Sequence, residues 1–182
     1  MRKLLRCLLM TVMTLCLSLP CFSAEAATVA LLPLINNVQG DEIATQIFYK
    51  EAINAMNAQK GFMMVENSKV INAIDAANVG NNVPDKATVA KIAKDGNVDI
   101  VIAIQLDKIE DETLFSSEEN KIKVNIKGKA VSYNRLTGVY DVRKINEETL
   151  TPEVFSSRWD LPHEEWGKVV RSEIKKALSA KK

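Results

Sequence analysis

Residues 99–106 read Asp-Ile-Val-Ile-Ala-Ile-Gln-Leu and form the most strongly apolar run of the chain after residue 26. The run is short, rich in β-branched residues and free of polar alternation, which predicts a strand covered on both faces. Such a strand occupies the centre of a sheet, with other elements packed above and below it. The run therefore points to a layered α/β fold.

Strand-like and helix-like segments alternate before this run. Two further apolar runs predict strands at 27–34 and 62–65. Helical spacing of apolar residues predicts three helices, over 43–56, 69–77 and 86–94. The alternation of strands and helices favours parallel pairing in this half of the chain.

The residue types at the helix ends support these assignments. The residues that stand where an N-cap is expected are Asp41, Asn67 or Ser68, and Asp85. Gly96 is expected to end the third helix. In the second helix, the side chains expected to face the core are Val70, Ile71 and Ile74.

The chain after residue 106 predicts an antiparallel extension of the sheet. Residues 110–120 are acidic and contain serines, which predicts a solvated loop. Residues 121–126 alternate between charged or polar and apolar side chains, which predicts a half-buried strand. The turn 135–138, Arg-Leu-Thr-Gly, leads into a further strand at 139–145.

The last predicted element is an amphipathic helix from about residue 161 to residue 180, with Trp166 on its apolar stripe. The predicted order is βαβααβββα in a single domain, residues 27–182. We expect an α/β fold in three layers or two, with a mixed sheet that ends in an antiparallel C-terminal hairpin.

Residues 1–26 have the features of a secretory signal peptide. Three cations, Arg2, Lys3 and Arg6, precede the uncharged apolar run 7–19, and Ala24-Glu-Ala26 offers small residues at a cleavage site. A membrane anchor is the alternative, but a helix over this run spans only about 20 Å, short of a hydrocarbon core of about 30 Å. We therefore expect cleavage near Ala26 and an extracytoplasmic mature protein, periplasmic or secreted, that does not span a membrane.

Removal of this segment changes the cysteine count and the charge of the protein. The three cysteines, Cys7, Cys16 and Cys21, all lie before residue 27, so the mature chain has no disulfide and no thiol nucleophile. Pro20 stands before Cys21, where lipidation requires a small residue. The precursor has 24 basic and 23 acidic residues; without Arg2, Lys3, Arg6 and Glu25 these become 21 and 22, a net charge of −1. This balance argues against nucleic acid as a partner.

No motif for catalysis, a metal or a cofactor can be written from the chain. The single histidine, His163, has no second ligand at residue 167, where Gly stands, and it is expected to be solvent-exposed. The glycines are spaced singly, so neither a dinucleotide fingerprint nor a phosphate loop is present. We expect a protein that is not an enzyme and has no cofactor. An enzyme with a carboxylate site assembled in space is a third alternative.

Four lysines of one strand are candidate partner-binding residues. Lys121, Lys123, Lys127 and Lys129 share one parity, so their side chains are expected to project from one face as a basic ladder. One interpretation is a binding module for an anionic ligand or glycan. The other is a solvated face whose lysines discourage aggregation at a strand edge.

Arg158 and Trp159 are the other candidate partner-binding residues. Tryptophan and arginine are enriched at the centres of protein interfaces, and Trp159 stands between Arg158 and Asp160 near the start of the last helix. Trp166, in contrast, is expected to belong to the core.

Several segments together resemble a known family of envelope modules. They are Val29-Ala-Leu-Leu-Pro-Leu34 with Asn36, Phe62-Met-Met-Val-Glu-Asn67, Val70-Ile-Asn-Ala-Ile74, Lys91-Ile-Ala-Lys94 and Val98-Asp-Ile-Val-Ile-Ala103. The pattern, over roughly 28–110, resembles the anticodon-binding-domain-like module of the curli-export lipoprotein CsgG, the penicillin-binding-protein activator LpoB and the TolB amino-terminal domain.

The resemblance implies a non-enzymatic, partner-binding domain of the cell envelope. Such a domain is expected to act by protein–protein contact in assembly, export or cell-wall machinery. Its partners would be envelope proteins of open identity, with a homo-oligomer as a further possibility. The resemblance supplies no catalytic residues.

Overall fold

The structure is a computed structural model that describes residues 26–115, 117, 120–153 and 160–179. The protein contains one mixed sheet, with its longest strand at the centre. The strand order is β3-β1-β4-β5-β6, and β2 pairs with β4 at the end of β1. The strands are β1 (Ala27–Leu31), β2 (Ile35–Asn36), β3 (Phe62–Met64), β4 (Ile100–Leu114), β5 (Lys121–Asn134) and β6 (Val139–Pro152). The first three pair in parallel and the last three are antiparallel, which confirms the predicted mixed sheet.

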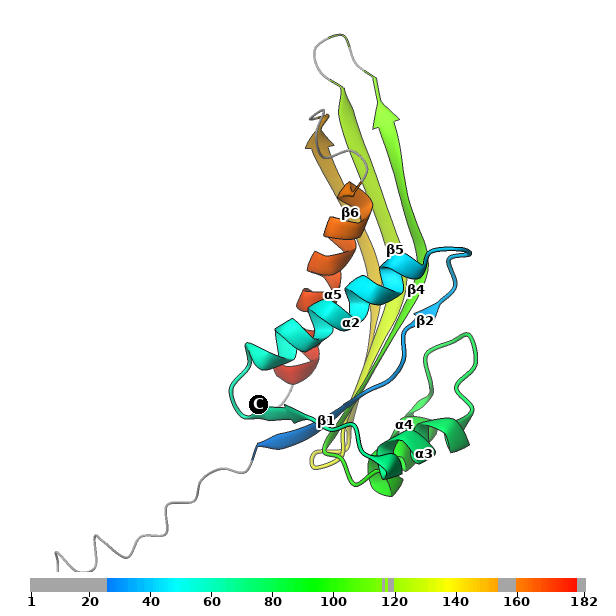
Figure 1. The fold of residues 1–182 in the computed structure, drawn as a ribbon, viewed down its shortest axis with the longest axis vertical. Coiled ribbons are helices and arrows are strands. Elements are labelled where there is room, and N and C mark those ends of the chain that lie inside the picture. Colours follow the sequence, from blue (N-terminus) through cyan, green and yellow to red (C-terminus); the bar gives the residue numbers. More distant parts are fainter. Residues whose placement is uncertain (1–25, 116, 118–119, 154–159, 180–182) are drawn as a thin grey trace, which may run out of the picture.

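Helices cover both faces of one end of this sheet (Figure 1). They are α2 (Glu42–Asn57), α3 (Ser68–Ala77), α4 (Lys86–Asp95) and α5 (Leu161–Ser179). Helices α2 and α5 pack on one face and bury Phe48 and Trp166 against it. Helices α3 and α4 pack on the other face, around Ile92 and Val101. The central run 99–106 is thus covered on both sides, as predicted.

Trp166 connects the two helices of the larger layer. Its side chain is fully buried, and its indole N–H donates to the backbone oxygen of Ala44 at 2.9 Å. Gly167 follows it, where a Cβ would lie 3.3 Å from the Glu51 side chain, so α2 and α5 approach closely. The expected role of Trp166 in the core is confirmed.

The predicted helix caps are present. The side chains of Asp41, Asn67 and Asp85 each accept a hydrogen bond from a backbone N–H three residues later, at 2.8–2.9 Å. Gly96 ends α4 in a right-handed conformation, and the left-handed residue is Asn97, with φ 51°. Space around residue 96 is tight, since a Cβ would lie 3.0 Å from the backbone oxygen of Ile92 and 3.2 Å from the Val70 side chain.

Three predicted boundaries need correction. The strand predicted over 27–34 ends at Leu31, and a second strand begins at Ile35, because the register with β4 shifts around Pro33. The acidic segment 110–120 is not all loop, since β4 continues to Leu114. Likewise β6 runs to Pro152 instead of ending near residue 145. In both strands the polar residues have cross-strand partners on β5, which a single segment of sequence does not show.

One side chain expected in the core is outside it. Ile71 is 51% exposed, whereas the buried side chains of α3 are Val70 and Ala73. The helix has ten residues and turns only a narrow stripe toward the sheet, so a residue next to Val70 already faces solvent.

A β-bulge separates the helix-covered end of the sheet from the rest. The pairing of β4 with β5 shifts between Leu106 and Lys108, which leaves Asp107 as the extra residue. Before the bulge, even-numbered residues such as Ile104 face α2 and α5; after it, Ile109 does. Gly128 lies opposite, where a Cβ would overlap the backbone oxygen of Gln105.

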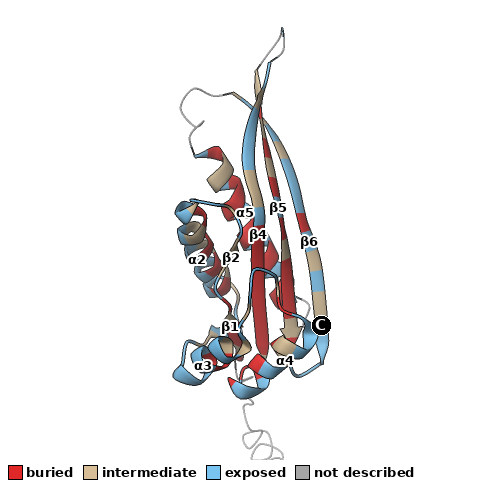
Figure 2. Ribbon diagram, turned by 90° about the vertical axis from the view of Figure 1, so that its right-hand side faces the viewer, coloured by how far each residue is buried: buried red, intermediate tan, exposed pale blue. Residues whose placement is uncertain are grey.

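Beyond the bulge, β4, β5 and β6 extend past α3 and α4 (Figure 2). We call residues 108–114, 121–127 and 146–152 the arm. On one side the base of the arm contacts α5, through Ile109 and Ile126. The molecule is therefore three layers thick at one end and two or fewer along the arm.

Candidate functional site

The arm presents a sheet face that α3 and α4 leave uncovered, which we call the open face. Its side chains form rows across β4, β5 and β6, and the pairing of the strands fixes each row. From the helices outward, the rows of the arm are Lys108–Lys127–Asn146, Glu110–Asn125–Glu148, Glu112–Lys123–Leu150 and Leu114–Lys121–Pro152. The row before them, Gln105–Lys129–Lys144, continues the same face toward the helices, where Gln105 is buried and accepts from the Val83 N–H. The face is thus basic near the helices and mixed in charge farther out.

The lysines predicted to form a ladder do project from one face. The apolar residues between them, such as Ile122 and Val124, are buried on the opposite face. The four lysines differ in their surroundings, however. Lys123 pairs with Glu148 at 3.0 Å, while Lys127 and Lys129 lie next to further lysines. The ladder is therefore not one uniform basic strip.

The outer end of the arm carries exposed apolar side chains. Phe115 is 80% exposed, Leu150 53% and Leu114 38%. Leu114 and Leu150 lie on the open face in the last two rows, and Phe115 follows directly on Leu114. These residues were not predicted from the sequence, because their position on the open face follows only from the observed lengths of β4 and β6.

The other two predicted partner-binding residues, Arg158 and Trp159, lie outside the described residues, as does the predicted signal peptide up to Glu25. The first residue after the predicted cleavage site, Ala27, begins β1, and its N–H donates to the backbone oxygen of Gly61 at 2.9 Å.

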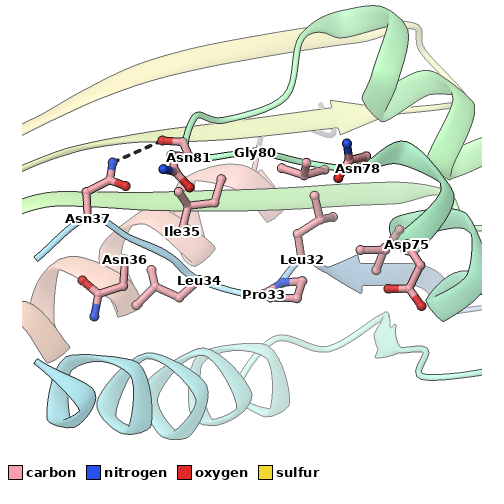
Figure 3. Close-up of a pocket in the computed structure, with 12 residues that line it drawn as sticks. Leu32, Pro33, Leu34, Ile35, Asn36, Asn37, Asp75, Asn78, Gly80 and Asn81 are labelled. Atoms are coloured by element: carbon pink, nitrogen blue, oxygen red, sulfur yellow. Dashed lines mark hydrogen bonds between the residues drawn. The ribbon is translucent and has the colours of Figure 1, made fainter. Parts of the chain in front are cut away.

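A groove of about 460 Å³ lies where β1 ends, between the β1–β2 connection and the end of α3 (Figure 3). Its walls combine apolar side chains such as Leu34 and Ile74 with amide groups. Asn37 donates to the backbone oxygen of Asn81 at 3.2 Å and so links the two walls. Asp75 is the one ionisable residue among those that line the groove. This lining offers no acid–base pair for catalysis.

A second groove, of about 520 Å³, runs between α2 and α5 and contains His163. The prediction that His163 is solvent-exposed is wrong: its side chain is 21% exposed, and its Nε2 lies 3.1 Å from Asp41 Oδ1. Asp41 also caps α2, so this contact joins the start of α5 to the start of α2. Farther along the groove, Arg171 pairs with Glu51.

Buried carboxylates occur between α5 and β6, next to a small cavity of about 170 Å³. Glu173 accepts from Arg143 Nε at 2.8 Å and from Lys176 at 2.6 Å. Glu165 accepts from Lys168 at 2.6 Å and from the Thr149 hydroxyl at 3.2 Å. These bonds hold the edge strand to the last helix and leave both carboxylates paired. The arrangement favours a structural role over the alternative of a carboxylate-based enzyme site.

Shifted pKa values are found at the helix-covered end. Burial alone raises the pKa of Asp99, but hydrogen bonds from the Thr28 N–H and hydroxyl, together with Arg135, hold it below its ordinary value. Burial raises the pKa of Tyr140, whose hydroxyl donates to the backbone oxygen of Pro84 at 3.0 Å. Asp99 thereby ties β1 and β4 to the β5–β6 turn.

The described residues lack two features of other functional classes. Within these residues, no helix is long and apolar enough to cross a membrane. They also hold no group of three or more His, Cys, Asp or Glu side chains placed to bind a metal ion.

Comparison with known proteins gives likenesses of fold. No protein-family model and no curated protein matches the chain. A solved structure of the hypothetical protein CT253 from Chlamydia trachomatis is similar, with 9% identity and a TM-score of 0.45 over 86% of this chain and 95% of that one. So is the PelC dodecamer from Paraburkholderia phytofirmans, with 12% identity and a TM-score of 0.41 over 88% and 89%.

The LpoB C-terminal domain from Salmonella enterica is also among the similar structures, with 8% identity and a TM-score of 0.37 over 69% of this chain and 83% of that one. LpoB is therefore named both in the predicted resemblance and among the similar structures. The likeness to CsgG and to the TolB domain stays a prediction. Similarities at these identities concern the fold alone.

Proposed function

We propose that this protein is an exported, non-catalytic domain of the cell envelope that acts by binding a protein through the outer end of its arm. The observation that carries the proposal is the exposure of Phe115, Leu114 and Leu150 at this end. When a partner covers a large apolar side chain that is exposed to water, the free energy falls by about 25 cal/mol per Å² of apolar area buried. Contiguous apolar groups with a polar rim are typical of protein contact surfaces.

The surroundings of these side chains support contact with a protein. Lys121 and Lys123, on β5, lie between Leu114 on β4 and Leu150 on β6, and Glu112 lies opposite Lys123, so charged groups of both signs lie among the apolar ones. Such charges orient a protein partner and add specificity to the contact. Because the β4–β5 hairpin projects from the helix-covered end, its tip reaches a partner without rearrangement of the core (Figure 1).

Export is part of the proposal and rests on residues 1–26. Mass spectrometry of the protein recovered from the envelope or the medium tests it. We expect a chain that begins at Ala27, whose N–H already belongs to the sheet. Recovery of the uncleaved chain from the cytoplasm would contradict this part of the proposal.

Co-purification with variants tests the contact. In the cell that encodes the protein, the tagged full chain is crosslinked mildly and recovered from the envelope fraction. The variants are Phe115→Ser with Leu150→Ser at the tip, and Leu136→Ser with Val139→Ser at the opposite end. The control pair is also exposed, at 65% and 47%, and lies at the β5–β6 turn.

We expect a specific protein, or a second copy of the chain, to be recovered with the native protein and with the control, and to be lost with the tip variant. Equal recovery with all three would overturn the tip as the contact, and recovery of no specific protein with the native chain would overturn the proposed function.

A further inference from the structure

Two adjacent rows at the base of the open face bring four lysines together. Lys108 on β4 lies directly opposite Lys127 on β5, and Lys129 on β5 lies directly opposite Lys144 on β6. We call these four residues the basic cluster. Only two of them belong to the predicted ladder. The other two come from neighbouring strands, so the cluster appears only when the sheet register is known.

The pairing within the basic cluster is unfavourable for the protein alone. Like charges directly opposite each other on neighbouring strands destabilise a sheet, whereas opposite charges stabilise it. The outer rows follow the favourable pattern: Glu112 lies opposite Lys123, which pairs with Glu148. A departure from this pattern in two adjacent rows is the kind of local cost that proteins retain at functional sites.

The charges of the basic cluster are largely available to a ligand. Lys108 pairs with Glu110. The nearby Asp107, at the bulge, accepts hydrogen bonds from the Asn37 and Gln105 side chains. Among the described residues, no carboxylate is within ion-pair distance of Lys127, Lys129 or Lys144.

From this juxtaposition we infer that the basic cluster binds an anionic polysaccharide, one whose repeating units carry carboxylate, sulfate or phosphate groups. Neighbouring strands lie about 4.8 Å apart and alternate residues about 7 Å apart. The four ammonium groups therefore spread over a flat area that matches anionic groups on successive units of an extended chain. The site is separate from the apolar tip proposed above to bind a protein.

A membrane surface is a weaker match for this face. Besides the lysines, the two rows of the cluster contain only amides: Gln105, which is buried, and Asn146. They offer no apolar side chain to enter a lipid layer, which interfacial binding requires in addition to charge. Asn146 is exposed on β6, where an amide can bond to sugar hydroxyls.

Binding of dextran sulfate to the full mature chain tests the inference, with uncharged dextran and phosphatidylglycerol vesicles as the comparison ligands. The test variant carries Lys→Gln at 108, 127, 129 and 144. A matched control removes the same number of charges at the exposed lysines 60, 69, 91 and 94, away from the arm. Unfolding in urea is followed for all three proteins.

We expect salt-sensitive binding to dextran sulfate that falls at least about tenfold in the test variant and less than about threefold in the control. The test variant is expected to be no less stable than the native chain, because it loses like-charge pairs. Three results would overturn the inference: no binding by the native chain at low salt, an equal loss in the control, or preference for the vesicles.

Discussion

The helix-covered end of the molecule and the arm share the strands β4, β5 and β6 but obey different constraints. Before the bulge at Asp107, β4 is apolar on both faces, since helices cover each of them. After the bulge, the strand alternates, with charged residues on the open face. The buried residues that stabilise the fold are thus concentrated at the helix-covered end, and the exposed charged and apolar side chains lie along the arm (Figure 2).

Two phenylalanines give the largest expected difference between the two regions. Phe48 on α2 is fully buried, and Phe48→Ala is expected to reduce the free energy of unfolding by about 4 kcal/mol. Phe115 at the tip is 80% exposed, and Phe115→Ala is expected to change it by less than about 0.5 kcal/mol. Urea unfolding followed by circular dichroism measures both. A comparable loss of free energy of unfolding in the two variants would contradict the distinction between the helix-covered end and the arm.

The junction between the regions is tested by Gly128→Ala. A Cβ at this position overlaps the backbone oxygen of Gln105 beside the bulge, so strands β4 and β5 must separate. We expect a loss of about 3 kcal/mol in the free energy of unfolding. Gly80→Ala is the control, since a Cβ there meets nothing within 4 Å. Equal stability of the two variants would show that the bulge is not a fixed joint.

Ion pairs at the helix-covered end are expected to contribute more to the free energy of unfolding than ion pairs on the arm. Glu173 is 5% exposed and pairs with Arg143, so Glu173→Gln is expected to cost roughly 2 kcal/mol, because Arg143, 18% exposed, keeps only Asp141 as a carboxylate partner. Glu110, 46% exposed, pairs with Lys108 on the arm, and Glu110→Gln is expected to cost less than about 0.5 kcal/mol. Urea midpoints decide between this order and its reverse.

The pH dependence of stability gives the smallest of these effects. Hydrogen bonds hold the pKa of Asp99 in the folded protein below its ordinary value. The Asp99 carboxylate therefore stabilises the fold at a pH above its pKa in the unfolded chain. This stabilisation is lost as the pH falls through its pKa in the folded protein. The stability difference between the native chain and Asp99→Asn should therefore shrink below about pH 4. Asp111→Asn, at an exposed residue of the arm, is the matched substitution for comparison. A constant difference for Asp99→Asn would contradict this role.

The helix-covered end could be predicted from the sequence because its elements carry their own patterns. Asp41, Asn67 and Asp85 are recognisable caps next to helical periodicity. The central run has no polar alternation, which already requires cover on both faces. These features are local, so one segment of sequence is enough to recognise each of them.

The arm could be predicted only in part, since its features depend on pairing between distant segments. The parity of the lysines on β5 was recognisable, but the partners of Lys127 and Lys129 are set by the register with β4 and β6. The bulge at Asp107 also reverses which residues of β4 face α2 and α5, so the sequence of charged residues after it is typical of a loop. For the same reason the contact of His163 with Asp41, 122 residues apart in the chain, was not predicted.

Site-specific photo-crosslinking in the cell tests most directly the claim that the arm is the contact surface. A photoreactive phenylalanine analogue is placed at Phe115 or, for comparison, at Leu136, which is exposed at the opposite end. We expect a discrete crosslinked product, to another envelope protein or to a second copy, from position 115 and none from position 136. Products from position 136 alone, or no product from either, would contradict it.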